Sequence, residues 1–178
     1  MLDVEGQVVG TDIENYSSNN LKDFDISFAI PSNSLIKIIP SLSTKGYYLH
    51  PWLGAAGADV TPDIAKALNL TESRGFLVIS VANLSPAKKT GILGGDNTTS
   101  INGRDITLGG DIILKVDDID VHNIQDISRY IENEKKVGDT IVVDVLRNRI
   151  MQTMNVKLGS NLAFLPWLDK QQRRYKIK

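Results

Sequence analysis

The chain is organised around one apolar segment of small residues, His50-Pro51-Trp52-Leu53-Gly54-Ala55-Ala56-Gly57-Ala58-Asp59. Two glycines interrupt this segment, and a glycine inside a strand pattern marks a bulge or a close approach by another backbone. A peptide that adds itself as a strand to an exposed sheet edge makes such an approach. A core strand crowded by its neighbours has the same composition, so the surrounding sequence must decide between the two interpretations.

The overall composition is ordinary for a soluble globular protein. The 178 residues are 42% hydrophobic and 23% charged, with a net charge of −1. This length fits one full domain and a smaller part, and the low net charge gives no indication of a nucleic-acid partner. The sequence holds no cysteine and only two histidines, His50 and His122, so it predicts no disulfide, no metal site and no cofactor. No apolar run is long enough to cross a membrane.

Residues 1–46 predict two strands and a helix. Strand patterns cover Gln7–Ile13 and Ile26–Ile30, and the polar segment Asn15–Asp25 between them predicts a loop. The helix that follows has one apolar face, made by Leu35, Ile38, Ile39 and Leu42. Two strands and one helix cannot bury a core by themselves, so we expect residues 1–46 to be the C-terminal remnant of another domain.

Three kinds of residue set the limits of this first helix. Ser32 or Asn33 is expected to cap its beginning, because a short polar side chain can accept a hydrogen bond from the first turn. Gly46 is expected to end it. Pro40 lies inside the pattern and is expected to bend or shorten the helix.

From Tyr47 on, the patterns predict a compact domain of five or six short strands and two helices. Thr61 and Asn123 cap the two helices, and Ser85 caps a single turn. On the second helix, one apolar face holds Ile124, Ile127 and Ile131, with Tyr130 beside them. The glycine-rich segment from residue 94 to residue 110 predicts a polar loop. The principal strand patterns are Gly75–Val81, Asp111–Val116, Ile119–Val121, Thr140–Arg147 and Met151–Leu158.

Several motifs in this order resemble a PDZ domain, and more narrowly the circularly permuted PDZ domain of the HtrA/DegP family of trypsin-like serine proteases. These motifs are Trp52-Leu53-Gly54-Ala55, Arg74-Gly75-Phe76-Leu77-Val78, Ser85-Pro86-Ala87, Gly110-Asp111-Ile112-Ile113 and Val137-Gly138-Asp139-Thr140. Upstream, Glu5–Gly10 and Ser27–Asn33 resemble the last strands of that family's protease domain, and residues 39–51 resemble the linker helix that follows it.

The resemblance implies a β-rich α+β fold. Residues 47–160 would form a PDZ-like, partly open β-barrel or sandwich with two helices. Residues 1–46 would be a remnant of a chymotrypsin-like β-barrel, and residues 161–178 an apolar and then basic tail.

The same resemblance implies peptide binding. In this family the groove uses three sets of residues, which here would be Trp52, Leu53, Gly54 and Ala55 for the ligand's C-terminal carboxylate; Ala56, Gly57 and Ala58 for its backbone; and Ile127, Tyr130 and Ile131 for its last side chain. The expected partners are C-terminal or unfolded peptide segments, and further protease subunits. Intact proteins of the family act in protein quality control outside the cytoplasm or at a membrane.

The resemblance does not extend to a catalytic triad. Proteases of the family carry a Gly-Asn-Ser-Gly-Gly motif shortly before the strand that here is Gln7–Ile13, and this chain begins after that point. We therefore expect no catalytic residue, and no nucleophile motif accompanies His50 or His122. The alternative is that the chain is a truncated part of an active HtrA-type serine endopeptidase.

Two other patterns are weaker. Asp117, Asp118 and Asp120 suggest a calcium loop, but the glycine and the distal glutamate of that motif are absent, which favours a hairpin turn. The basic residues after Asp169 follow the apolar segment Phe164–Leu168 and would suit an anionic membrane surface. A solvated chain end is the simpler interpretation of this tail, so membrane contact is not expected.

Overall fold

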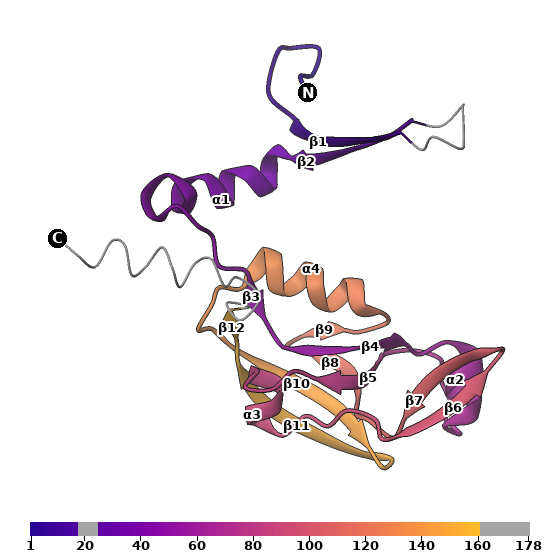
Figure 1. The fold of residues 1–178 in the computed structure, drawn as a ribbon. Helices are drawn as coiled ribbons and strands as arrows, with labels where there is room; N and C mark the ends of the chain where they lie inside the picture. The colour runs from indigo at the N-terminus through magenta and orange to yellow at the C-terminus, as the bar shows by residue number, and fades with distance from the viewer. Residues whose placement is uncertain (18–24, 161–178) are drawn as a thin grey trace. The chain divides into compact units, whose positions relative to one another are not determined.

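The chain divides into two compact units, Met1–Tyr48 and Leu49–Lys178. A computed structural model describes residues 1–17 and 25–160 of them (Figure 1). The tail predicted at residues 161–178 lies outside the described residues. Within the described ranges, no helix is both long enough and apolar enough to cross a bilayer.

The first unit contains a β-hairpin and one helix. Strand β1 (Gly10–Ser17) pairs antiparallel with β2 (Asp25–Pro31), and α1 (Ser32–Lys45) follows directly. The predicted strand Gln7–Ile13 therefore begins too early and ends too early. The polar residues that follow, as far as Ser17, also belong to the strand, because their backbone pairs with β2 up to Asp25. The alternation of side chains in the sequence does not reveal this pairing.

Helix α1 departs from the sequence prediction at its beginning. Pro31 occupies the N-cap position and no side chain caps the helix, so neither Ser32 nor Asn33 has the predicted role. Proline is accommodated at a helix start because the first N–H groups have no partner within the helix. Pro40 lies inside the helix without shortening it, and Gly46 ends it in the left-handed conformation, as predicted.

The second unit is built on one antiparallel sheet in the order β11-β10-β8-β5-β4, with β9 paired to β8. The strands are β4 (Ala55–Asp59), β5 (Phe76–Val81), β8 (Ile112–Val116), β9 (Ile119–Asp120), β10 (Thr140–Arg147) and β11 (Ile150–Lys157). Two short strands, β3 (Pro51–Trp52) and β12 (Gly159–Ser160), pair with each other beside it. Among the described residues, strand β4 is thus an edge strand, with β5 on one side only.

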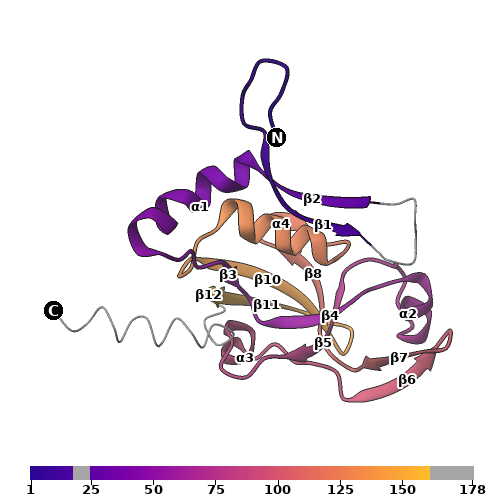
Figure 2. The same ribbon diagram turned by 45° about the horizontal axis from the view of Figure 1, so that its top comes forward.

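Three helices accompany this sheet: α2 (Pro62–Ala67), α3 (Pro86–Thr90) and α4 (Ile124–Glu134). The predicted N-caps are confirmed, since the side chains of Thr61, Ser85 and Asn123 each accept a backbone N–H of the following turn. Helix α3 is a short helix where we predicted a single turn, so the described part of this unit, residues 49–160, has three helices instead of two. Figures 1 and 2 show α4 beside β3 and β4, and α3 beside β11.

The glycine-rich segment after α3 is not the polar loop that we predicted. It contains the hairpin of β6 (Asn97–Ile101) and β7 (Arg104–Leu108), joined by Asn102 and Gly103 with φ of 51° and 76°. Asn-Gly with both residues in the left-handed region is a strong two-residue hairpin turn, so the sequence held a signal that we missed. Leu108 is buried in a secondary core, with the isoleucines of the hairpin packed against it.

The main core lies between the sheet and its helices. Its members include buried aliphatic residues from β8, β10 and β11, together with Phe76, Ile127 and Ile131. The structure therefore confirms the predicted β-rich α+β fold class. Most of the stability of the second unit comes from this buried apolar surface, because each large side chain removed from water contributes roughly 1.5–3 kcal/mol.

Candidate functional site

The open edge of β4 offers backbone groups to a partner strand. The hydrogen bond from Ala82 N–H to the Gly54 carbonyl is 2.9 Å long and flanks the pair Ala55–Val81. In an antiparallel ladder, a residue flanked in this way turns its own N–H and C=O away from the paired strand. The bond from Val60 N–H to the Gly75 carbonyl has the same relation to Asp59. Both ends of β4 therefore direct backbone groups to the edge without a partner strand.

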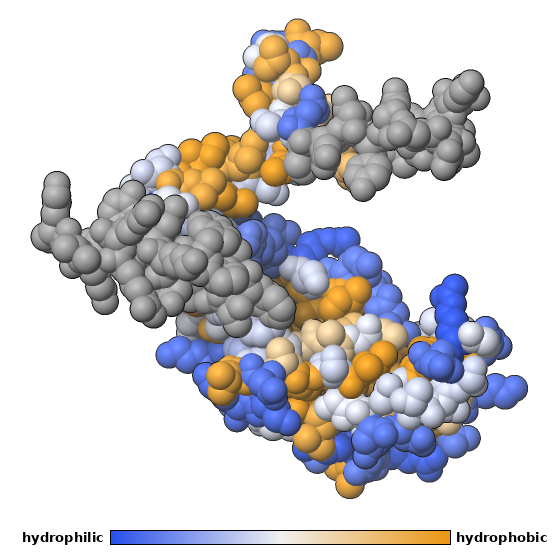
Figure 3. Space-filling view, viewed as in Figure 1, coloured by the Kyte–Doolittle hydropathy of each residue, from blue (hydrophilic) through white to orange (hydrophobic). Residues whose placement is uncertain are grey.

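An apolar cleft of about 350 Å³ lies between the start of β4 and helix α4. Its walls include Leu53 and Ala55 on one side, Ile127 and Ile131 on the other, and Phe76 of β5. The area between α4 and β4 is coloured orange and cream in Figure 3, in contrast to the blue outer surface of the helix. A narrow apolar space beside an open strand edge suits an extended peptide whose alternate side chains point into it.

The segment before β4 is held tightly, with its carbonyl groups directed away from the cleft. Leu53 and Gly54 are buried, and their carbonyl oxygens accept hydrogen bonds from Ala87 and Ala82 at 2.9 Å. Their own N–H groups have no acceptor within residues 1–17 and 25–160. Successive N–H groups that converge on one space form a site for an anion, such as a carboxylate.

Gly54 cannot be replaced without movement. Its φ is +85°, and a Cβ added to it would lie 2.2 Å from the Cβ of the buried Ser85. The ring of Trp52 also packs close, with Cη2 3.2 Å from that position. The glycine is thus required by both backbone conformation and space.

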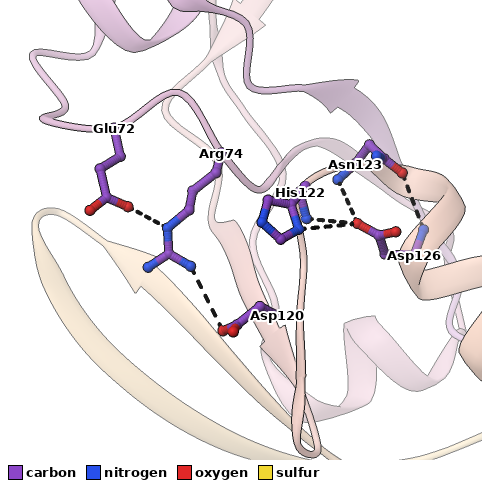
Figure 4. A network of polar contacts seen from close by, with 6 residues as sticks. All are labelled: Glu72, Arg74, Asp120, His122, Asn123 and Asp126. Carbon is purple, nitrogen blue, oxygen red and sulfur yellow. Dashed lines mark hydrogen bonds and ion pairs between the residues drawn. The ribbon is translucent and has the colours of Figure 1, made fainter.

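The N-terminal end of α4 is fixed by a network that Figure 4 shows. Asn123 and Asp126 form a reciprocal capping box, and Asp126 also accepts from the backbone N–H of His122 at 2.9 Å. Across the end of the cleft, Asp59 of β4 accepts the Ile124 N–H at 2.7 Å. The neighbouring Arg74 joins Glu72 and Asp120 in an ion-pair chain on the surface (Figure 4).

The C-terminal end of α4 is fixed through Asp117, in the turn between β8 and β9. The Tyr130 hydroxyl donates to Asp117 Oδ2 at 2.8 Å, and Lys135 Nζ lies 2.9 Å from the same oxygen. Burial alone would raise the pKa of Asp117, but the hydrogen bonds from the Val142 N–H, Lys135 and Tyr130 together lower it. The pKa of Lys135 is raised, first by its hydrogen bond to Asp117 and then by the one to Tyr130.

The structure brings together five of the ten predicted site residues at the cleft, and these are Trp52, Leu53, Ala55, Ile127 and Ile131. Gly54 shapes the loop at one end of it, and Ala56, Gly57 and Ala58 lie along β4, where their pairing with a ligand stays a prediction. Tyr130 does not line the cleft. A half-buried phenol favours a polar partner, and the Tyr130 hydroxyl reaches Asp117.

Sequence analysis missed Phe76, Ile124 and Glu132, which also line the cleft. Ile124 carried a usable signal, because it shares the apolar face of Ile127 and Ile131. Phe76 carried no such signal, since the sequence predicts that its strand is buried but not that Phe76 faces a cleft.

The two histidines pair with carboxylates. His50 Nδ1 lies 3.0 Å from Glu132 Oε1 at the cleft wall, and His122 Nδ1 lies 3.6 Å from Asp126 Oδ2. Among the residues that the structure describes, no cluster of three His, Cys, Asp or Glu side chains is arranged to hold a metal ion.

Acid should weaken the fold through the carboxylates that hold α4. The pKa of Asp126 is lowered, mainly by the hydrogen bond from the His122 N–H, and that of Asp117 is lowered as well. A lowered pKa in the folded state stabilises it fully above the unfolded value, here 3.8, and the stabilisation is lost as pH falls through the lowered value. We expect Asp126→Asn to reduce the difference in urea midpoint between pH 7 and pH 3. An unchanged difference would contradict this role of Asp126.

The comparisons with known proteins agree with this geometry. Residues 108–158 match the family model of the PDZ domain. A probable periplasmic serine endoprotease, DegP-like, from Brucella suis biovar 1 (strain 1330) is 35% identical over 117 residues, which are 66% of this chain and 23% of the relative. A protein of the same description from Marinomonas sp. (strain MWYL1) is 28% identical over 158 residues, or 89% of this chain and 30% of that protein. The chain thus spans about a quarter of the length of these relatives.

Solved structures show the same fold. The HtrA-type protease AlgW with a decapeptide superposes with a TM-score of 0.69 at 24% identity, over 89% of this chain and 44% of that one. AlgW with a tripeptide gives a TM-score of 0.65 at 24% identity, over 89% and 47% of the two chains. The PDZ-like architecture predicted from the sequence motifs is confirmed by these matches.

Proposed function

We propose that this chain, an HtrA/DegP-family region that contains a PDZ domain, binds the C-terminal or unfolded segment of a peptide between β4 and α4. The observation that carries the proposal is the apolar cleft beside the open edge of β4. The ligand would add one strand to the sheet, with its backbone paired to β4. The AlgW structures contain a decapeptide and a tripeptide, which supports this proposal.

Each part of the site has a task in this proposal. The N–H groups of Leu53 and Gly54 meet the terminal carboxylate of the ligand, and the last apolar side chain enters the cleft against Ile127 and Ile131. Ala56 and Ala58 are small, so they leave room for a strand to approach along β4. Burial of one large apolar side chain and a strand-like backbone suits an affinity on the order of micromolar, roughly −8 kcal/mol.

Amidating the peptide should abolish most of the binding. A peptide acid and its C-terminal amide differ in one charge, and only the carboxylate gains charge-assisted hydrogen bonds from the loop N–H groups. We expect the amide to bind at least about tenfold more weakly, because hydrogen bonds to a charged group contribute about 1.5–3 kcal/mol. Fluorescence anisotropy with a labelled peptide that ends in an apolar residue measures both affinities. Equal curves would show that the carboxylate is not recognised.

The second candidate function is proteolysis, which the names of the relatives favour. Those names describe periplasmic serine endoproteases, so the whole protein would act outside the cytoplasm in protein quality control, with further subunits as partners. In the printed sequence we identify no nucleophile with an adjacent base, and both histidines pair with carboxylates.

The purified 178-residue chain should therefore not cleave an unfolded substrate. Casein degradation, measured as the release of soluble peptides, should equal that of a buffer control, because the sequence carries no nucleophile motif beside either histidine. Turnover that a serine-directed fluorophosphonate blocks, in a preparation free of host protease, would establish the endopeptidase alternative instead.

A further inference from the structure

The two ends of α4 are held in different ways. At its beginning, the capping box and the bond from Ile124 N–H to Asp59 tie the helix both to its own turn and to β4. At its end, the C-cap Lys135 has extended backbone, Tyr130 and Lys135 both contact Asp117, and Glu132 pairs with His50. Only Ile127 and Ile131 of the helix are buried, so apolar packing alone leaves that end weakly specified.

Asp117 is attached firmly to the sheet. Its Oδ1 accepts the Val142 N–H at 2.7 Å, and its own N–H donates to the Val142 carbonyl at 2.7 Å. It occupies the left-handed region with φ of 50°, which fixes the direction of its side chain at the turn. Its other oxygen receives Tyr130 and Lys135, and the ring of Tyr130 lies 5.3 Å from the lysine Nζ. One carboxylate therefore joins β10 to the end of α4.

We propose that Asp117 is a positioning residue for the peptide cleft. Through Tyr130 and Lys135 it holds the C-terminal half of α4, and with it the Ile131 wall, at the distance from Leu53 and Ala55 that an extended peptide requires. The inference rests on the proposed peptide-binding function and adds to it residues that lie outside the cleft.

The Asp117 carboxylate would affect peptide affinity by raising the fraction of molecules in which α4 has the position that forms the cleft. The side chains of Asp117 and Lys135 are only 19% and 21% exposed, so their interaction is partly shielded from water. Without it, the end of α4 has several positions of similar energy, and the apparent dissociation constant rises in inverse proportion to the fraction in which the cleft is formed. A fall of that fraction to about one tenth gives a tenfold weaker apparent affinity.

The test compares four variants in the full chain. Asp117→Asn and Lys135→Met remove the ion pair, and Lys135→Arg keeps it. Asp144→Asn is the matched control, because Asp144 accepts a side-chain hydrogen bond from Thr153 within the β10–β11 hairpin, outside the cleft. The readouts are peptide affinity by fluorescence anisotropy and amide hydrogen exchange of the ligand-free protein.

We expect about tenfold weaker binding for Asp117→Asn and Lys135→Met, restored affinity for Lys135→Arg, and wild-type affinity for Asp144→Asn. Exchange should accelerate at residues 130–135 in the first two variants while the amides of β5 and β10 stay protected. Wild-type affinity of Lys135→Met, or equal acceleration across sheet and helix, would overturn the proposal. If the wild-type protein binds no peptide, the proposed function fails, and exchange alone decides whether Asp117 anchors α4.

Discussion

Replacing Gly54 with alanine should weaken peptide binding by at least about thirtyfold, while Gly103→Ala should leave the affinity unchanged. Both glycines lie in the left-handed region, with φ of +85° and +76°. An alanine there costs about 1–2 kcal/mol from backbone conformation alone. The two substitutions are therefore matched in chemistry and in backbone strain.

The two positions differ in how much room there is for an added Cβ atom. Nothing lies within 4 Å of a Cβ added at Gly103, whereas one added at Gly54 lies 2.2 Å from Ser85 Cβ and 2.8 Å from Ser85 Oγ. Ser85 is fully buried and its Oγ caps α3 by accepting the Lys88 N–H, so it cannot move aside cheaply. The loop itself must shift, which would displace the N–H groups of Leu53 and Gly54 that we propose meet the ligand's carboxylate.

Anisotropy titration and thermal unfolding of both variants measure the two effects separately. Gly54→Ala should lose about 2–4 kcal/mol of stability, the sum of backbone strain and overpacking, and Gly103→Ala about 1–2 kcal/mol. Peptide affinity of Gly54→Ala equal to that of Gly103→Ala, in folded samples, would show that the geometry of this loop does not control recognition.

The parts that sequence analysis predicted well depend on local chemistry. The caps at Thr61, Ser85 and Asn123 depend on hydrogen bonds within one turn, and Gly46 is required by a left-handed helix end, so short sequence patterns are enough. The apolar face of α4 follows from helical spacing, and its residues Ile127 and Ile131 are buried and line the cleft, while their role in peptide binding stays a prediction.

The parts that it missed depend on contacts between distant residues. Asp117 looked like a turn residue, and nothing local indicates that it binds Tyr130, Lys135 and Val142. The partner of the Tyr130 hydroxyl is a similar case, because a position beside an apolar face does not tell where a hydroxyl finds its acceptor. The β6–β7 hairpin is a different case, since its Asn-Gly turn was visible in the sequence and was outweighed by the polar composition around it.

Removing Arg147 should produce the largest loss of stability in the second unit. The side chain of Asp111 is 1% exposed, and Arg147 contacts it with Nε at 2.7 Å and Nη2 at 2.6 Å. The Leu93 N–H donates to the same carboxylate, and Arg147 also reaches the Gly91 carbonyl, so the pair joins β10 to the segment after α3. The hydrogen bonds to Asp111 raise the pKa of Arg147 further, and the guanidinium stays charged at any accessible pH.

Arg147→Met should lower the free energy of unfolding by about 3–5 kcal/mol, because it leaves a buried carboxylate without its counter-charge. The double variant Arg147→Met with Asp111→Leu should recover much of that loss, since an apolar pair in the same volume leaves no charge to desolvate.

Arg74→Met is the matched control, because Arg74 pairs with Glu72 and Asp120 at the surface, where such pairs contribute about 0–1 kcal/mol. Urea unfolding at pH 7 measures all three variants. A loss of less than about 1 kcal/mol for Arg147→Met would mean that water reaches Asp111 and that the pair behaves like a surface one. Because Arg147 and Asp111 lie outside the cleft, the peptide affinity of the folded fraction should stay at the wild-type value.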